Sequence, residues 1–167
     1  YTLGVLLAEQ GDPAMAQQHY ALALRADPFH FRARNNLALL LFENGQFDQA
    51  ELHYRQAMEL VPDHTAVLNN LGNTLVALQR SDEAVPLFQR AIELEPDSSL
   101  SHFNLGAALD TQGDLDRAAV AYAEAVRLDP GHVVAHNNLG VVKARMKKFD
   151  DAERYLRRAI ELDPDYQ

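Results

Sequence analysis

Five prolines recur in this sequence at a constant 34-residue interval: Pro28, Pro62, Pro96, Pro130 and Pro164. Four further series share this interval: a leucine followed by Gly or Ala, two separate alanines, and a large, mostly aromatic residue. The last series is Tyr20, Tyr54, Phe88, Tyr122 and Leu156. Coincident series at one period of this length are the signature of stacked structural repeats. The sequence therefore predicts a repeat protein built from units of this length.

Each unit is expected to form two amphipathic helices. In one unit, apolar residues recur at helical spacing at Leu37 and Leu41, and then again at Ala50, Tyr54 and Ala57. The repeated proline should end the second helix, because the residue before a proline is pushed out of the helical region. The pairs expected to end first helices are Gln10-Gly11, Asn44-Gly45 and Gln112-Gly113, and the residues expected to cap second helices are Asp12, Ser81 and Asp114.

The small residues of the repeat predict close helix packing. Gly or Ala follows the repeated leucine, and two alanines recur in the second helix, so paired helices can approach closely with the Tyr or Phe ring between them. One hairpin of this kind cannot bury its own apolar stripe, so neighbouring units must stack. The sequence thus predicts one elongated all-α domain over residues 1–167.

These residues resemble the tetratricopeptide repeat family along the whole chain. The resemblance implies a right-handed superhelical solenoid of antiparallel helix pairs. In the family's register the full units are 31–64, 65–98, 99–132 and 133–166, preceded by a unit at 1–30 that lacks its first four positions. The sequence departs from the family at the fourth position, where a bulky aromatic residue is replaced by Arg34, Leu68, His102 and His136.

The same resemblance indicates a binding surface. In this family the first helices line a concave groove, and carried over here the groove contains a file of asparagines. The carried-over residues are Asn35, Asn36, Asn69, Asn70, Asn73, Asn104, Asn137 and Asn138, together with Arg32, Phe103, Asp110 and Arg145. An Asn amide offers both donors and an acceptor, so it can bind a peptide backbone whatever the peptide's side chains are. The file resembles the amide ladder in the superhelical arm of O-linked N-acetylglucosamine transferases.

Other groove and site chemistries fit less well. The family's two-carboxylate clamp for acidic chaperone tails needs basic residues at the fifth and sixth positions, and this chain has none there. Recurrent histidines such as His30, His64 and His132 stand one or more repeats apart, too far to share one zinc ion. No phosphate-binding glycine loop or nucleophile motif is present. We therefore expect no catalytic residues, no metal and no cofactor in this segment.

Composition limits the partners. The chain carries a net charge of -9 and has no Cys, which disfavours nucleic-acid binding and excludes disulfides and thiolate chemistry. No stretch approaches the ~20 apolar residues of a membrane-spanning helix. We expect no nucleic acid and no membrane as partners, and the sequence leaves localisation open. A basic stretch between Lys143 and Arg158 stands out against the acidic background.

Three functions remain on the sequence alone. The first is a protein-interaction scaffold that holds an extended peptide or partner segment in the Asn-lined groove. The second is the substrate-recognition arm of a larger enzyme, such as a glycosyltransferase, because the chain opens on Tyr1 and ends soon after Pro164 like an excised segment. The third is self-assembly into a homo-oligomer through the repeat ends, with the basic stretch meeting an acidic surface of another copy.

Overall fold

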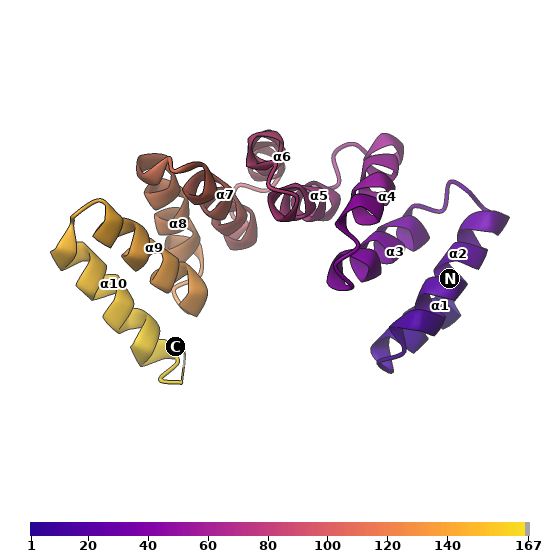
Figure 1. Cartoon of the computed structure of the whole chain (residues 1–167), viewed down its shortest axis with the longest axis horizontal. Coiled ribbons are helices and arrows are strands. Elements are labelled where there is room, and N and C mark those ends of the chain that lie inside the picture. The colour runs from indigo at the N-terminus through magenta and orange to yellow at the C-terminus, as the bar shows by residue number, and fades with distance from the viewer. Residues whose placement is uncertain (166–167) are drawn as a thin grey trace. The chain divides into compact units, whose positions relative to one another are not determined.

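The computed structural model describes residues 1–165, and these residues form ten α-helices and no strand (Figure 1). The helices are α1 (Thr2–Glu9), α2 (Pro13–Ala26), α3 (Phe31–Glu43), α4 (Phe47–Leu60), α5 (Thr65–Ala77), α6 (Ser81–Leu94), α7 (Ser99–Gln112), α8 (Leu115–Leu128), α9 (Val133–Arg145) and α10 (Phe149–Leu162). Two helices in every repeat confirm the all-α helical-repeat prediction. Within the described part of the chain, no helix combines the length and apolarity needed to cross a membrane.

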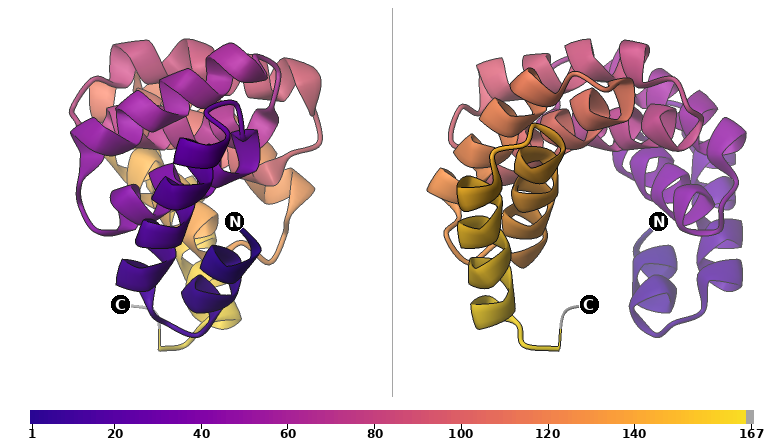
Figure 2. Two further views of the ribbon diagram at one scale, coloured as in Figure 1. Left: turned by 90° about the vertical axis from the view of Figure 1, so that its right-hand side faces the viewer. Right: turned by 60° about the vertical axis from the view of Figure 1, so that its left-hand side comes forward.

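The helices belong to two compact units. The first runs from Tyr1 to Gln79 and holds α1 to α5, and the second begins at Arg80 and holds α6 to α10. Within each unit every helix packs against the next one along the chain, as in the hairpins of α1 with α2 and of α9 with α10 (Figure 2). The boundary falls between α5 and α6, inside the repeat that the sequence register places at 65–98.

First helices end at a left-handed residue, as the glycine pairs predicted. Gly11, Gly45 and Gly113 have φ angles of +79°, +72° and +80°, a region that glycine enters without a steric penalty. The other two repeats make the same turn without glycine, because Gln79 and Lys147 adopt φ angles of 61° and 62°. The turn geometry is thus common to all repeats, and only the residue that supplies it varies.

Two of the three predicted caps of second helices are confirmed. The side chain of Asp12 accepts a hydrogen bond from Met15 N–H at 3.0 Å, and Asp114 accepts one from Arg117 N–H at 3.2 Å. The prediction for Ser81 is wrong, because Ser81 is the first residue inside α6 and its buried hydroxyl makes no hydrogen bond. Ser81 stands where other repeats begin the second helix with an apolar residue: Pro13, Phe47, Leu115 and Phe149.

Glycine and a large side chain meet inside the hairpins where the repeat predicts close packing. A Cβ added to Gly106 would lie 2.7 Å from Tyr122 Cδ1, and one added to Gly140 would lie 2.7 Å from Leu156 Cγ. The repeated alanines Ala16, Ala50 and Ala118 are fully buried. The small residues therefore set the distance between the paired helices, as expected.

The turns between repeats explain three of the four departures at the fourth position, all except the buried Leu68. His102 and His136 each place Nε2 about one hydrogen-bond length from the carbonyl oxygen of the preceding turn proline, at 3.0 Å from Pro96 and 3.1 Å from Pro130. The guanidinium of Arg34 donates to the carbonyl oxygen of Pro28 in the same way. A polar side chain at this position thus binds the turn, a role that an aromatic hydrocarbon ring cannot perform.

Candidate functional site

The structure places every predicted groove residue on the first helix of a hairpin. In the first compact unit these are Arg32, Asn35 and Asn36 on α3, and Asn69, Asn70 and Asn73 on α5. In the second they are Phe103, Asn104 and Asp110 on α7, and Asn137, Asn138 and Arg145 on α9. Each unit therefore carries its own set of amides, and the two sets are described separately.

A short chain of hydrogen bonds orders the amides of α9. The Asn137 Nδ2 group donates to Asn138 Oδ1 at 3.4 Å, and Asn138 Nδ2 donates to the hydroxyl oxygen of Tyr122 on α8, also at 3.4 Å. Both distances are at the long end of the hydrogen-bond range. The chain links a surface amide to a buried tyrosine of the preceding hairpin, and so holds the Asn138 side chain in one orientation.

The first unit repeats this arrangement. Asn35 Nδ2 donates to Asn36 Oδ1 at 3.3 Å, and Asn36 Nδ2 donates to the Tyr20 hydroxyl oxygen at 3.4 Å. The Tyr54 hydroxyl likewise has a side-chain hydrogen bond with Asn70. In all three cases the tyrosine and the asparagine have the same separation in the sequence, which reflects the repeat. At Phe88 the aromatic residue has no hydroxyl, so this bond cannot form with Asn104.

Burial keeps the hydroxyls of Tyr54 and Tyr122 protonated. Burial raises the pKa of Tyr122 to about 12, although the Asn138 hydrogen bond acts in the opposite direction. Burial, helped by the charge of Glu43, also raises the pKa of Tyr54. A protonated hydroxyl can accept from an Asn N–H and donate elsewhere, so the bond to the amide persists across the physiological pH range.

The asparagine side chains differ in exposure and in how many of their hydrogen-bonding groups are already used within the chain. Asn36 and Asn138 are partly exposed, and after the bonds described above each has one amide hydrogen and one lone pair left. Asn69 and Asn104 are only 5% exposed, and Asn69 Nδ2 donates to the Thr65 carbonyl oxygen of its own helix at 3.1 Å. Asn36 and Asn138, unlike the buried Asn69, thus keep amide atoms that are open to further hydrogen bonds.

The predicted selectivity residues of the second unit interact with their neighbours. Asp110 and Arg145 form an ion pair that joins α7 to α9. The Phe103 ring stacks on His132, with ring centroids 4.8 Å apart, and also contacts Tyr122 at 5.7 Å. In the first unit, Arg32 is exposed on the first turn of α3.

The repeated tyrosine is predicted to fill the space between paired helices, and the sequence prediction does not include the hydrogen bond of its hydroxyl. The signal was present in the constant separation between Tyr20 and Asn36, Tyr54 and Asn70, and Tyr122 and Asn138.

The turn histidines have structural roles. His30 Nδ1 accepts from Ala33 N–H, and His132 Nδ1 accepts from Ala135 N–H, each at 3.2 Å, so both histidines cap the following helix. Among the described residues, no three His, Asp or Glu side chains come together as a metal site.

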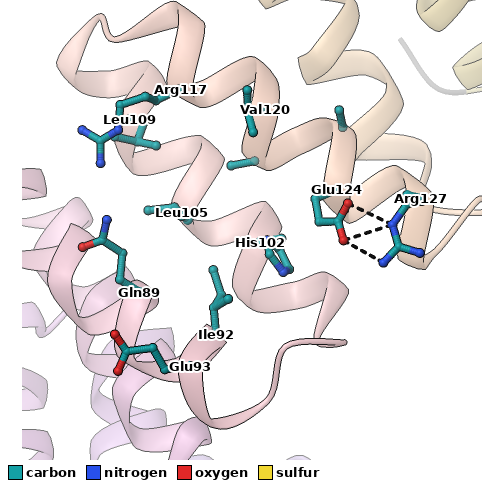
Figure 3. A pocket seen from close by; sticks show the side chains of 12 residues that line it. Gln89, Ile92, Glu93, His102, Leu105, Leu109, Arg117, Val120, Glu124 and Arg127 are labelled. Carbon is teal, nitrogen blue, oxygen red and sulfur yellow. Dashed lines mark hydrogen bonds and ion pairs between the residues drawn. The ribbon is translucent and has the colours of Figure 1, made fainter.

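A groove lies on the second unit, and none of the predicted asparagines lines it. We call it the α6–α8 groove: it runs between α6 and α8 with α7 as its floor, and it has a volume of about 1050 Å³ (Figure 3). Its apolar part is formed by Ile92, Leu105, Leu109, Val120 and Ala121 beside His102. None of the predicted groove residues lines it.

Comparison with known proteins agrees with this architecture. Among solved structures, the chain is similar to YrrB, a TPR protein with an unusual peptide-binding site, at 27% identity and a TM-score of 0.82, covering 99% of this chain and 85% of YrrB. It also shares its fold with MamA from Desulfovibrio magneticus RS-1, at 20% identity and a TM-score of 0.91, covering 99% of this chain and 94% of that one. PilW, a widely conserved type IV pilus biogenesis factor, matches at 23% identity and a TM-score of 0.91, covering 99% of this chain and 77% of PilW.

No curated protein matches the sequence significantly. Four family models, each described as a tetratricopeptide repeat, match residues 1–30, 29–95, 69–133 and 133–166. Together these matches cover residues 1–166. The chain therefore belongs to the tetratricopeptide repeat family.

Proposed function

We propose that the partly exposed amides of the first helices bind the backbone of an extended segment of a partner protein. One observation carries this proposal: two separate units hold the same chain of Asn, Asn and Tyr, at Asn35, Asn36 and Tyr20 and again at Asn137, Asn138 and Tyr122. In each copy the central amide is oriented by two neighbours and keeps one donor and one acceptor.

An amide with one donor and one acceptor matches the N–H and C=O of a peptide unit. Such contacts do not depend on the ligand's side chains, so the amides would supply affinity and neighbouring side chains would supply preference. In the second unit the ion pair of Asp110 with Arg145 and the ring of Phe103 flank the amides on α7 and α9, and in the first unit Arg32 lies on the helix of Asn36. The proposal thus describes tolerant binding tuned by a few side chains.

The test separates ligand binding from the internal hydrogen bond. Asn138→Ala removes both the amide and its bond to Tyr122, whereas Tyr122→Phe removes the same bond but leaves the amide in place. Both variants should be measured against a library of unstructured peptides, with circular dichroism to verify folding. We expect Asn138→Ala to weaken binding of the selected peptides at least tenfold, about 1.4 kcal/mol, and Tyr122→Phe to weaken it much less.

The same comparison in the first unit uses Asn36→Ala against Tyr20→Phe. If the folded asparagine variants of both units bind every selected peptide as tightly as the wild type, the amides do not hold the ligand and the proposal fails.

A further inference from the structure

One side chain that lines the α6–α8 groove, Ala121, is small for its position in the repeat. At the position of Ala121, the other repeats carry a larger residue: His19, His53, Leu87 and Tyr155. In the last repeat Tyr155 packs near His136, with ring centroids 6.1 Å apart. His136 corresponds in the repeat to His102, which lines the α6–α8 groove beside Ala121. The space that Tyr155 covers over His136 is therefore left uncovered over His102.

The first unit shows another way of filling this space. There the guanidinium of Arg34, at the position of His102, donates to the Gln56 side chain, at the position of Glu124. The charge of Arg34 also helps to lower the pKa of His53, which stands at the position of Ala121. In that repeat the position is occupied by polar side chains of the chain itself, and in the repeat of Ala121 it is open to a ligand.

The groove is apolar in its floor and balanced in charge at its rim. Val120 on α8 is 72% exposed beside Ile92, Leu105 and Leu109, a large exposure for an aliphatic side chain. The charged lining residues are two arginines and two glutamates: Arg117, Arg127, Glu93 and Glu124. The net charge of the lining is thus zero, although the net charge of the whole chain is -9. A ligand whose contact face is apolar and uncharged therefore complements the groove.

Most of the charged and polar groups around the groove, though not the Gln89 amide, already have partners within the chain. Glu124 pairs with Arg127 at 2.7 Å (Figure 3). Arg117 pairs with Asp114 at 3.3 Å and Glu93 with Arg90 at 2.9 Å, and each of the three pairs lies within one helix or its cap. His102 Nε2 contacts the Pro96 carbonyl oxygen. A ligand lying on the apolar floor would find few partners for its backbone there, so it must satisfy its own backbone hydrogen bonds.

A helix meets that requirement, since all its central backbone groups bond within the helix. The lining of α8 extends from Arg117 to Arg127, which corresponds to about 15 Å of helix axis, or almost three turns. We propose that the α6–α8 groove binds an amphipathic helix of a partner protein, which inserts an aromatic or leucine side chain over His102 beside Ala121. This inference concerns a different surface from the amides and does not depend on them.

The test uses a substitution that places a large side chain of the protein itself in the groove. Ala121→Tyr places at this position the residue that the last repeat already accommodates, so the variant should fold. Ala14→Tyr makes the same change at an exposed position of α2 and serves as the control. The probe is a displayed library of helical peptides, about four turns long, in which one face varies among Leu, Ile, Phe, Tyr and Met. Each selected peptide is compared with a version that carries a central proline.

We expect selected peptides to shift the amide resonances of Val120, Ala121 and Ala123 in the labelled protein. Their affinity should fall at least tenfold for Ala121→Tyr and for the proline peptides, and should not change for Ala14→Tyr or Asn138→Ala. The inference is overturned if no library member shifts these resonances, or if the folded Ala121→Tyr variant binds as the wild type does. It is also overturned if the proline peptides bind equally well, because the ligand would then not be a helix.

Discussion

The ring of Tyr122 lies directly over Gly106, where a Cβ atom would stand 2.7 Å from Tyr122 Cδ1 and 2.9 Å from Cε1. Tyr122 is 1% exposed and its hydroxyl accepts from Asn138, so the ring has little freedom to move away. The same ring therefore fixes the distance between α7 and α8 and connects α8 to α9.

Gly106→Ala should lower the free energy of unfolding by about 1 to 3 kcal/mol through over-packing. This loss should appear although Ala is the better helix former by about 1 kcal/mol. Urea unfolding followed by circular dichroism measures the change. In the double variant Gly106→Ala with Tyr122→Ala, the two losses should be less than additive, because alanine removes the side-chain atoms that the new Cβ would meet. A Gly106→Ala protein as stable as the wild type would show that the hairpin can open at no cost.

The left-handed turns predict stability changes of opposite sign. Lys147→Gly should stabilise the chain by about 0.5 to 1 kcal/mol, because glycine removes the steric penalty of a φ angle of 62°. The gain is partly offset because glycine has more conformational freedom in the unfolded chain. Gly113→Ala should destabilise it by about 1 kcal/mol; a Cβ there would contact no other atoms, so the loss reflects backbone conformation alone. Urea unfolding of both variants would measure the two stability changes. If both variants were stabilised, or both destabilised, the φ angle would not be the cause.

The 34-residue spacing of the sequence predicts most of the fold, and the residue types at the turns predict most of the remainder. The spacing of Leu, Ala, Tyr and Pro predicts the hairpins, and the Gly pairs predict their turns. The same turns at Gln79 and Lys147 escape prediction, because the φ angle there is imposed by the packed helices and not by the residue type. Ser81 was mistaken for a cap since a serine near a helix start resembles one, although its repeat position belongs to the helix.

For the candidate sites too, the sequence predicts the residue types but not the contacts that depend on packing. The asparagines are visible in the sequence, but their hydrogen bonds to Tyr20 and Tyr122 depend on how hairpins pack, which no local pattern states. The α6–α8 groove is formed by side chains of three helices, among them the small Ala121, and such a feature becomes apparent only when the repeats are compared in space.

His53 makes stability depend on pH. Burial, with a further contribution from the charge of Arg34, lowers the pKa of His53 below its usual value of 6.5. The folded state then binds fewer protons than the unfolded state, so stability should fall as pH drops through about 6.5 and level off below the folded-state pKa. His53→Gln should make this decline shallower between about pH 7 and about pH 5. Urea unfolding of both proteins across that range would show it, and parallel curves would contradict the assignment.

The ion pair of Asp110 with Arg145 joins two hairpins at a partly exposed site, with side-chain exposures of 24% and 46%. A double-mutant cycle with Asp110→Ala and Arg145→Ala should give a coupling energy of about 0.2 to 1 kcal/mol at low salt. The coupling should largely disappear in about 1 M salt, where the Debye length is about 3 Å. A coupling that does not change with salt would mean that packing, not charge, connects the two side chains.

The turn histidines offer a matched test of helix capping. His132 Nδ1 accepts from Ala135 N–H at 3.2 Å, whereas the side chain of His64 makes no such bond and its Nδ1 is buried without a partner. Both rings pack on a Phe at the same centroid distance of 4.8 Å, so loss of ring contact is common to both alanine variants. His132→Ala should therefore cost about 1 kcal/mol more than His64→Ala, the usual contribution of an N-cap. His132→Asn should recover that difference, because asparagine is itself a good cap. If His64→Ala proves as costly as His132→Ala in urea unfolding, the contribution of these histidines lies in their rings and not in the hydrogen bond to the helix.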